Sequence, residues 1–84
     1  MILKIFTQLN CPRCPAAKKL GKEIEKEGKI KVEWFDVSIV DGLAEASFYS
    51  VLSTPGLILV DERGEEIAGW RGEVPSKTEV ERYI

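Results

Sequence analysis

Two short apolar runs constrain the fold of this 84-residue chain more than any other feature. Residues 2–6 contain a single polar side chain, and residues 57–60 contain none. Runs without polar alternation are typical of central strands in a sheet that is covered on both faces. A chain of this length has room for one such core, so we expect one domain over residues 1–84.

The segments around these runs follow helix and strand patterns in turn. Apolar side chains from Cys14 to Ile24 recur at three- or four-residue intervals, which predicts a helix that ends near Gly28. Residues 30–34 alternate between apolar and polar, as in a strand with one buried face. A second helix is expected to start with Asp41 as its N-cap. Its expected inner face consists of Leu43, Ala44, Phe48, Val51 and Leu52.

The last third of the chain predicts a hairpin and a terminal helix. Residues 61–64 are a turn that joins the second apolar run to a strand at 65–70. Ser76 and Glu79 have the spacing of a capping box, which opens a helix.

The predicted element order is therefore β-α-β-α-β-β-α. The first β-α-β unit requires a parallel pair of strands, whereas the hairpin requires an antiparallel pair. We therefore expect an α/β fold in which a four-stranded mixed sheet is flanked by three helices. Trp34 and Trp70 fall on predicted strands, where we expect them to pack in the core.

The two cysteines, Cys11 and Cys14, stand where the first strand ends and the first helix begins. A C-x-x-C pair beside a β-α-β pattern is typical of a redox centre. We expect Cys11 at or next to the N-cap, where free N–H groups and the helix dipole favour the thiolate, and Arg13 adds positive charge. Cys11 is thus the predicted nucleophile, and Cys14, one turn further and facing the core, the predicted resolving thiol.

Two prolines support this placement at the start of a helix. Pro12 would take the first helical position, where its missing N–H is no loss. Pro15 would be the fourth helical residue, where it removes only one hydrogen bond.

Composition argues against several other function classes. Twelve basic and fourteen acidic residues are interspersed, so no basic patch indicates nucleic acid. No apolar stretch reaches membrane-spanning length, and the N-terminal residues do not resemble a signal peptide. We therefore expect a cytoplasmic monomer with no nucleic-acid or membrane partner. With two cysteines and no histidine, no metal site is expected. The many Glu and Lys, with one Asn and one Gln, favour a thermophilic source.

The order of strand, Cys-Pro-Arg-Cys, helix, strand, helix, Ser-Thr-Pro, hairpin, Gly-Trp-Arg-Gly and helix resembles the thioredoxin superfamily over the whole chain. It is most similar to the short glutaredoxin-like thioredoxins of archaea and some bacteria. This resemblance implies a thioredoxin-like fold and a thiol–disulfide oxidoreductase that reduces protein disulfides. A separate reductase would supply the electrons, either a flavoenzyme like thioredoxin reductase or glutathione. The redox group would be the Cys11–Cys14 disulfide, with no other cofactor.

The resemblance also implies the residues that surround the cysteines. Pro12 and Arg13 would support the redox pair from within the motif. Pro55 would be a cis proline against the cysteines, and Thr54 would pair its backbone with an incoming peptide. The rest of the substrate groove would consist of Gly69, Trp70, Arg71 and Gly72.

Three positions depart from the family pattern. Asn10 stands where thioredoxins usually have a Trp, and Ile5 stands near the place of their buried Asp. We therefore expect water, the leaving thiolate or a substrate group to take the proton of Cys14. Residues 71–75 replace the acidic segment by which many glutaredoxins hold glutathione, which argues against glutathione as a ligand.

Three other functions fit the same residues. If the thiol–disulfide exchange runs in the opposite direction, the chain would be a disulfide oxidase or isomerase. A homodimer that uses Cys11 of both subunits and two small thiols could hold an iron–sulfur cluster, as some glutaredoxins do. A non-catalytic interaction domain is the third.

Overall fold

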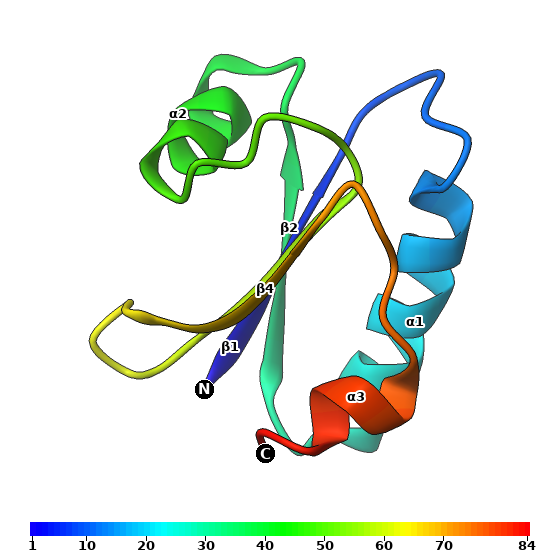
Figure 1. The fold of residues 1–84 in the computed structure, drawn as a ribbon, viewed down its shortest axis with the longest axis vertical. Coiled ribbons are helices and arrows are strands. Elements are labelled where there is room, and N and C mark those ends of the chain that lie inside the picture. Colours follow the sequence, from blue (N-terminus) through cyan, green and yellow to red (C-terminus); the bar gives the residue numbers. More distant parts are fainter.

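The computed structural model describes all 84 residues and shows a mixed sheet with helices on both faces (Figure 1). The sheet has the strand order β2-β1-β3-β4, in which β1 runs parallel to β2 and antiparallel to β3, and β4 runs antiparallel to β3. The predicted α/β fold is confirmed. The elements are β1 (Ile2–Thr7), α1 (Cys14–Glu27), β2 (Lys31–Asp36), α2 (Val40–Phe48), β3 (Gly56–Val60), β4 (Glu66–Arg71) and α3 (Lys77–Glu81).

The two apolar runs form the central strands β1 and β3, as predicted. All five residues of β3 are buried, and alternate side chains enter opposite faces of the sheet. Helices α1 and α3 cover one face and α2 covers the other (Figure 1). The core on the α1 face consists of Leu3, Ile5, Ala17, Leu20, Ile24, Val32, Leu57, Leu59, Trp70 and Val80.

The α2 face has a smaller apolar core and a charged group within it. Lys4 of β1 points to this face, where its ammonium group pairs with Glu45 of α2 and lies 3.2 Å from Glu33 of β2. The ammonium also lies over the rings of Phe35 and Tyr49, at 5.2 and 5.4 Å from the ring centroids. Burial by itself would lower the pKa of Lys4, but the hydrogen bonds and charges of the two glutamates outweigh it and raise that pKa. The apolar core here consists of Phe6, Ala46, Tyr49, Val51, Ile58 and Val60.

Helix α2 turns a different face to the sheet from the one predicted. Its buried residues are Gly42 and Ala46, and its N-cap is Ile39, with Asp41 inside the first turn. Gly42 lies so close to the backbone of Asp36 that any side chain would overlap it, so small residues must face the sheet. Of the five residues expected inside, only Val51 is buried, whereas Leu43, Ala44, Phe48 and Leu52 are exposed.

The two tryptophans have different surroundings. Trp70 is buried as expected and packs edge-on against Tyr83. Trp34 is 38% exposed, contrary to the prediction, and the strand that carries it, β2, lies at the edge of the sheet. Its ring lies against Gly21, and its indole N–H donates to Glu25 at 3.4 Å.

The predicted ends of the other elements are largely confirmed. Helix α1 ends at Gly28, which has a left-handed conformation with φ of 72°. Ser76 and Glu79 form the predicted capping box at the start of α3. None of the three helices combines the length and apolar character that crossing a lipid bilayer requires.

Candidate active site

Both cysteines lie at the end of the sheet where β1 passes into α1. Cys14 is the first residue of α1 and is only 3% exposed, whereas Cys11 lies before the helix and is half-buried. The two are joined by a disulfide bond, and their Cα atoms lie 5.3 Å apart, a usual spacing for disulfides. The sulfur nearer the solvent therefore belongs to Cys11, as predicted.

The helix begins later than predicted. Arg13, without a side-chain capping bond, is the N-cap, so Cys11 lies two residues before the N-cap rather than at it or next to it. Pro15 is the second helical residue rather than the fourth. Pro15 has no N–H to donate to the carbonyl of Cys11, so the segment from Cys11 to Cys14 forms a separate turn. That turn is closed by the N–H of Cys14, which donates to the carbonyl of Cys11 at 3.3 Å, and the first α-helical bond joins Ala17 to Arg13. Pro12 lies in this turn and is exposed.

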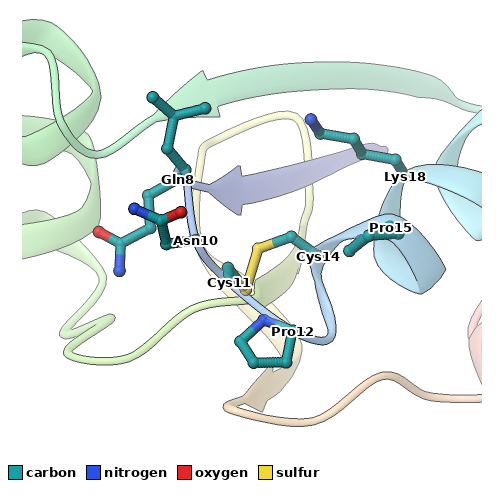
Figure 2. Close-up of a pocket in the computed structure, with 8 residues that line it drawn as sticks. Gln8, Asn10, Cys11, Pro12, Cys14, Pro15 and Lys18 are labelled. Atoms are coloured by element: carbon teal, nitrogen blue, oxygen red, sulfur yellow. A yellow bond between two sulfur atoms is a disulfide. The ribbon is translucent and has the colours of Figure 1, made fainter.

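A shallow depression of about 510 Å³ adjoins the disulfide (Figure 2). Its only charged lining residue is Lys18, which extends from α1 toward the loop that carries Gln8. Asn10, in a left-handed conformation with φ of 60°, also lines it, at the position where thioredoxins usually place a Trp. The complete lining is Gln8, Leu9, Asn10, Cys11, Pro12, Cys14, Pro15 and Lys18.

No acidic or histidine side chain lines this depression. Ile5, near the position of the buried thioredoxin Asp, is fully buried in the apolar core. The carboxylate of Asp36, at the end of β2, accepts hydrogen bonds from the hydroxyl and N–H of Ser38. These bonds lower the pKa of Asp36, and the charge of Lys18 lowers it further. No carboxylate therefore lines the depression that adjoins the cysteines.

The Thr54–Pro55 peptide bond is cis, as the resemblance implies. Pro55 is fully buried just before β3, and its carbonyl accepts a hydrogen bond of 2.8 Å from the N–H of Gly72. Thr54 is half-buried, and neither its N–H nor its carbonyl is hydrogen-bonded within the chain. A second depression, of about 270 Å³, is lined by Thr54 on one side and shares Gln8 with the first.

Of the four expected groove residues after the hairpin, only Gly72 follows the strand. Gly69, Trp70 and Arg71 remain inside β4, because its pairing with β3 continues as far as Arg71 opposite Gly56. Trp70 is buried, and Arg71 is held by Glu66 and by the carbonyl of Tyr49. Gly72, with φ of 78°, starts the turn.

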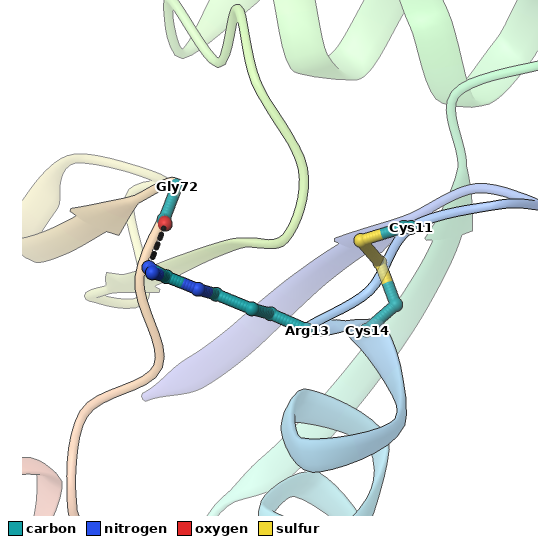
Figure 3. The surroundings of a disulfide bond; sticks show 4 residues. All are labelled: Cys11, Arg13, Cys14 and Gly72. Carbon is teal, nitrogen blue, oxygen red and sulfur yellow. Dashed lines mark hydrogen bonds between the residues drawn. A yellow bond between two sulfur atoms is a disulfide. The ribbon is translucent and has the colours of Figure 1, made fainter.

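Arg13 connects the cysteine turn to Gly72. Its guanidinium extends away from the disulfide, and Nη1 donates to the carbonyl of Gly72 at 3.1 Å (Figure 3). From the sequence, this charge was expected beside the sulfur of Cys11. The contact with Gly72 was missed, since nothing in the sequence signals a partner 59 residues away.

No cluster of three or more His, Cys, Asp or Glu side chains is arranged to hold a metal ion. The cysteine pair provides two sulfurs that can share a disulfide bond or be reduced to two thiols.

The fold and this cysteine pair are those of a thiol–disulfide oxidoreductase of the thioredoxin superfamily. A family model described as "Thioredoxin domain" matches residues 1–84, and the chain belongs to this family. It is 31% identical over 62 residues to a protein of Archaeoglobus fulgidus named "Probable Thioredoxin", covering 74% of this chain and 68% of that protein. It is 28% identical over 57 residues to a protein of Methanocaldococcus jannaschii named "Thioredoxin", covering 68% of this chain and 67% of that protein.

Solved structures agree with this assignment. Thioredoxin 1 of Thermosipho africanus superposes with a TM-score of 0.78 at 26% identity, covering 99% of this chain and 93% of that one. A mutant thioredoxin of Halobacterium salinarum shares the fold, with a TM-score of 0.83 at 22% identity, covering 99% of this chain and 70% of that one. Family, fold and cysteine pair together make this chain a protein-disulfide oxidoreductase.

Proposed function

We propose that the chain reduces protein disulfides, with Cys11 as the nucleophile and Cys14 as the resolving thiol. The observation that carries this proposal is the unequal burial of two linked cysteines at the start of α1: Cys11 is open to a partner, and Cys14 is 3% exposed. No acidic residue lies in the first turn of α1, so nothing there offsets the positive end of the helix dipole. That positive end favours a thiolate over a thiol.

The reaction transfers two electrons in two exchange steps. The Cys11 thiolate attacks one sulfur of the substrate disulfide, which forms a mixed disulfide and releases the other substrate sulfur as a thiolate. Cys14 then loses its proton, and its thiolate attacks the Cys11 sulfur. The second substrate thiolate leaves, so the substrate is fully reduced and the Cys11–Cys14 disulfide is formed. With no carboxylate at hand, solvent or the departing substrate thiolate takes the proton of Cys14.

The backbone of Thr54 is the proposed docking edge for the substrate. Its unpaired N–H and carbonyl can bond an extended peptide as a short added strand. The hydrogen bond from the N–H of Gly72 to the carbonyl of Pro55 holds this segment at the start of β3.

A separate reductant must return the Cys11–Cys14 disulfide to the dithiol. We propose a flavoenzyme like thioredoxin reductase, with glutathione as the other candidate. The chain itself would act as a monomer in a reducing compartment such as the cytoplasm. Because the redox group is the cysteine pair, the cycle needs no bound cofactor.

The experiment is insulin reduction with dithiothreitol as the electron source. We expect the wild type to accelerate insulin reduction and Cys11→Ser to give only the uncatalysed rate. Cys14→Ser, the matched control with one thiol left, is reduced, freed of dithiothreitol and mixed with insulin, and should then accumulate as a mixed-disulfide adduct because no resolving thiol is present. Cys11→Ser that reduces insulin as fast as the wild type would overturn the proposal. Visible absorbance after anaerobic purification would instead favour the iron–sulfur alternative.

A further inference from the structure

Arg13 is the only charged residue between the two cysteines, and its polar contacts are few. Its side chain is exposed, it forms no ion pair, and the carbonyl of Gly72 is its one hydrogen-bond partner. A guanidinium has five N–H donors in a planar fork, so most of those of Arg13 are free. Glu73, which follows Gly72 in the sequence, forms no ion pair with Arg13.

The bond to Gly72 holds this cation at the proposed docking edge. Gly72 donates its N–H to Pro55 at 2.8 Å and accepts the bond from Arg13 at 3.1 Å, so it links the cysteine turn to the segment after Thr54 (Figure 3). A substrate chain that pairs with Thr54 and extends along Pro55 toward Gly72 would approach the guanidinium of Arg13.

The charge of this region has the opposite sign to that of the chain. The chain as a whole has a formal net charge of −2. The depressions that adjoin the cysteines and Thr54 nevertheless contain no Asp or Glu, and Lys18 supplies the only charge in their linings. Arg13, exposed and bonded to Gly72, adds a second positive charge on the other side of the cysteine turn. Asp36, near Lys18, and Glu73, next to Gly72, are the acidic residues closest to these two cations. The free donors of Arg13 complement a carboxylate.

We propose that Arg13 is a specificity-determining residue that selects polypeptides with an Asp or Glu beside the reactive disulfide. One N–H stays on Gly72, and the remaining donors of the fork bind the substrate carboxylate. The proposal rests on the proposed function, because it names the substrates of that same site. It is distinct from that function, since the exchange chemistry itself needs no acidic substrate.

The test compares two peptides that differ only beside a single reducible disulfide, where one has Glu and the other Gln. Each peptide is labelled so that reduction raises its fluorescence, and kcat/KM is measured for both. The quantity of interest is the ratio of the Glu value to the Gln value. The variants are Arg13→Gln, Arg13→Lys and the control Arg63→Gln, which makes the same charge change at an exposed position in the hairpin turn. That turn lies at the far end of the sheet from the cysteine loop (Figure 1).

We expect the wild type and Arg63→Gln to prefer the Glu peptide by about threefold to fivefold at low salt, the scale of an exposed ion pair. Arg13→Gln should bring the ratio to about 1, and Arg13→Lys should keep part of the preference because it keeps the charge without the fork. About 500 mM salt should weaken the wild-type preference by screening. Unchanged thermal midpoints will show that the variants are folded.

Three results would overturn the proposal: a wild-type ratio near 1, an Arg13→Gln ratio equal to that of the wild type, or an equal loss of preference in Arg63→Gln. A failure of the proposed function gives a different result: the wild type then reduces neither peptide. That result would overturn this inference as well.

Discussion

The two faces of the sheet are stabilised in different ways. The α1 face, which ends at Cys14, is a continuous apolar core of ten buried residues. The core on the α2 face has only six buried residues. Beside this core, Lys4 forms ion pairs with Glu33 and Glu45. On that side much of the apolar surface of α2 points to solvent, with Phe48 76% exposed.

This difference bears directly on function. The helix that positions the cysteines is fixed by close packing of large side chains, so the start of α1 has little freedom to shift. Helix α2 is held by its glycine contact with Asp36 and by the ion pairs of Lys4. We therefore expect substitutions on the α1 face to affect stability more than those on the α2 face.

The largest effect tests this comparison within one strand. Leu59 and Ile58 are adjacent and both fully buried, but they enter the α1 face and the α2 face, respectively. We expect Leu59→Ala to lower the free energy of unfolding by about 3–5 kcal/mol and Ile58→Ala by about 2–3 kcal/mol, because the smaller core can relax around a cavity. Urea unfolding of the oxidised protein measures both, and a larger loss for Ile58→Ala would contradict the comparison.

A smaller effect is expected for Lys4→Met, which removes the cation that joins β1, β2 and α2. Its side chain is 11% exposed and both carboxylates are partly exposed, so the expected loss is about 1–2 kcal/mol at pH 7. Because folding raises the pKa of Lys4, its stabilisation is complete below the ordinary value of 10.5 and is lost as pH rises through the higher folded value.

The pH dependence separates this role from simple packing. The difference in unfolding free energy between wild type and Lys4→Met should be constant through neutral pH and should shrink above pH 10.5. The control is Lys31→Met, because Lys31 also pairs with Glu33 but is 68% exposed, and its expected loss is below about 0.5 kcal/mol. A difference that stays constant through the alkaline range would show that the charge of Lys4 does not stabilise the fold.

The smallest effect is expected at Leu52, in the loop that follows α2. Leu52 is 93% exposed, so Leu52→Ser should change the free energy of unfolding by less than about 0.5 kcal/mol. Val51→Ser, at the buried neighbouring residue, should cost several times more. The sequence predicts that Val51 and Leu52 both face the core, so it predicts similar losses for the two variants. Thermal unfolding of the two variants distinguishes that prediction from the unequal losses expected from the structure.

The same contrast explains which parts of the fold could be predicted. The buried stripe of α1, from Cys14 to Ile24, consists of apolar residues at helical spacing between polar ones. This pattern alone is sufficient to predict the helix and its buried face. On α2 the large apolar residues predict the wrong inner face, because the residues that face the sheet are Gly42 and Ala46. Gly42 is required by the close approach of α2 to the backbone of Asp36, a tertiary contact that no local pattern contains.

The candidate site shows the same limit. The positions of Cys11 and Cys14 follow from a motif at a strand–helix junction, and the cis bond before Pro55 follows from the family resemblance. The contact from Arg13 to Gly72 joins segments 59 residues apart and could come only from the structure. The later start of α1 follows from Pro15, whose missing N–H leaves the segment from Cys11 to Cys14 as a separate turn, and this effect is larger than the helix pattern predicts.

The central claim is that Cys11, rather than Cys14, is the reactive sulfur. It is tested most directly by alkylation of the reduced single-cysteine variants with iodoacetamide at pH 7. We expect Cys11 in Cys14→Ser to react at least about tenfold faster than Cys14 in Cys11→Ser, because it is more exposed and the start of α1 favours its thiolate. Equal rates, or a faster reaction at Cys14, would contradict the account.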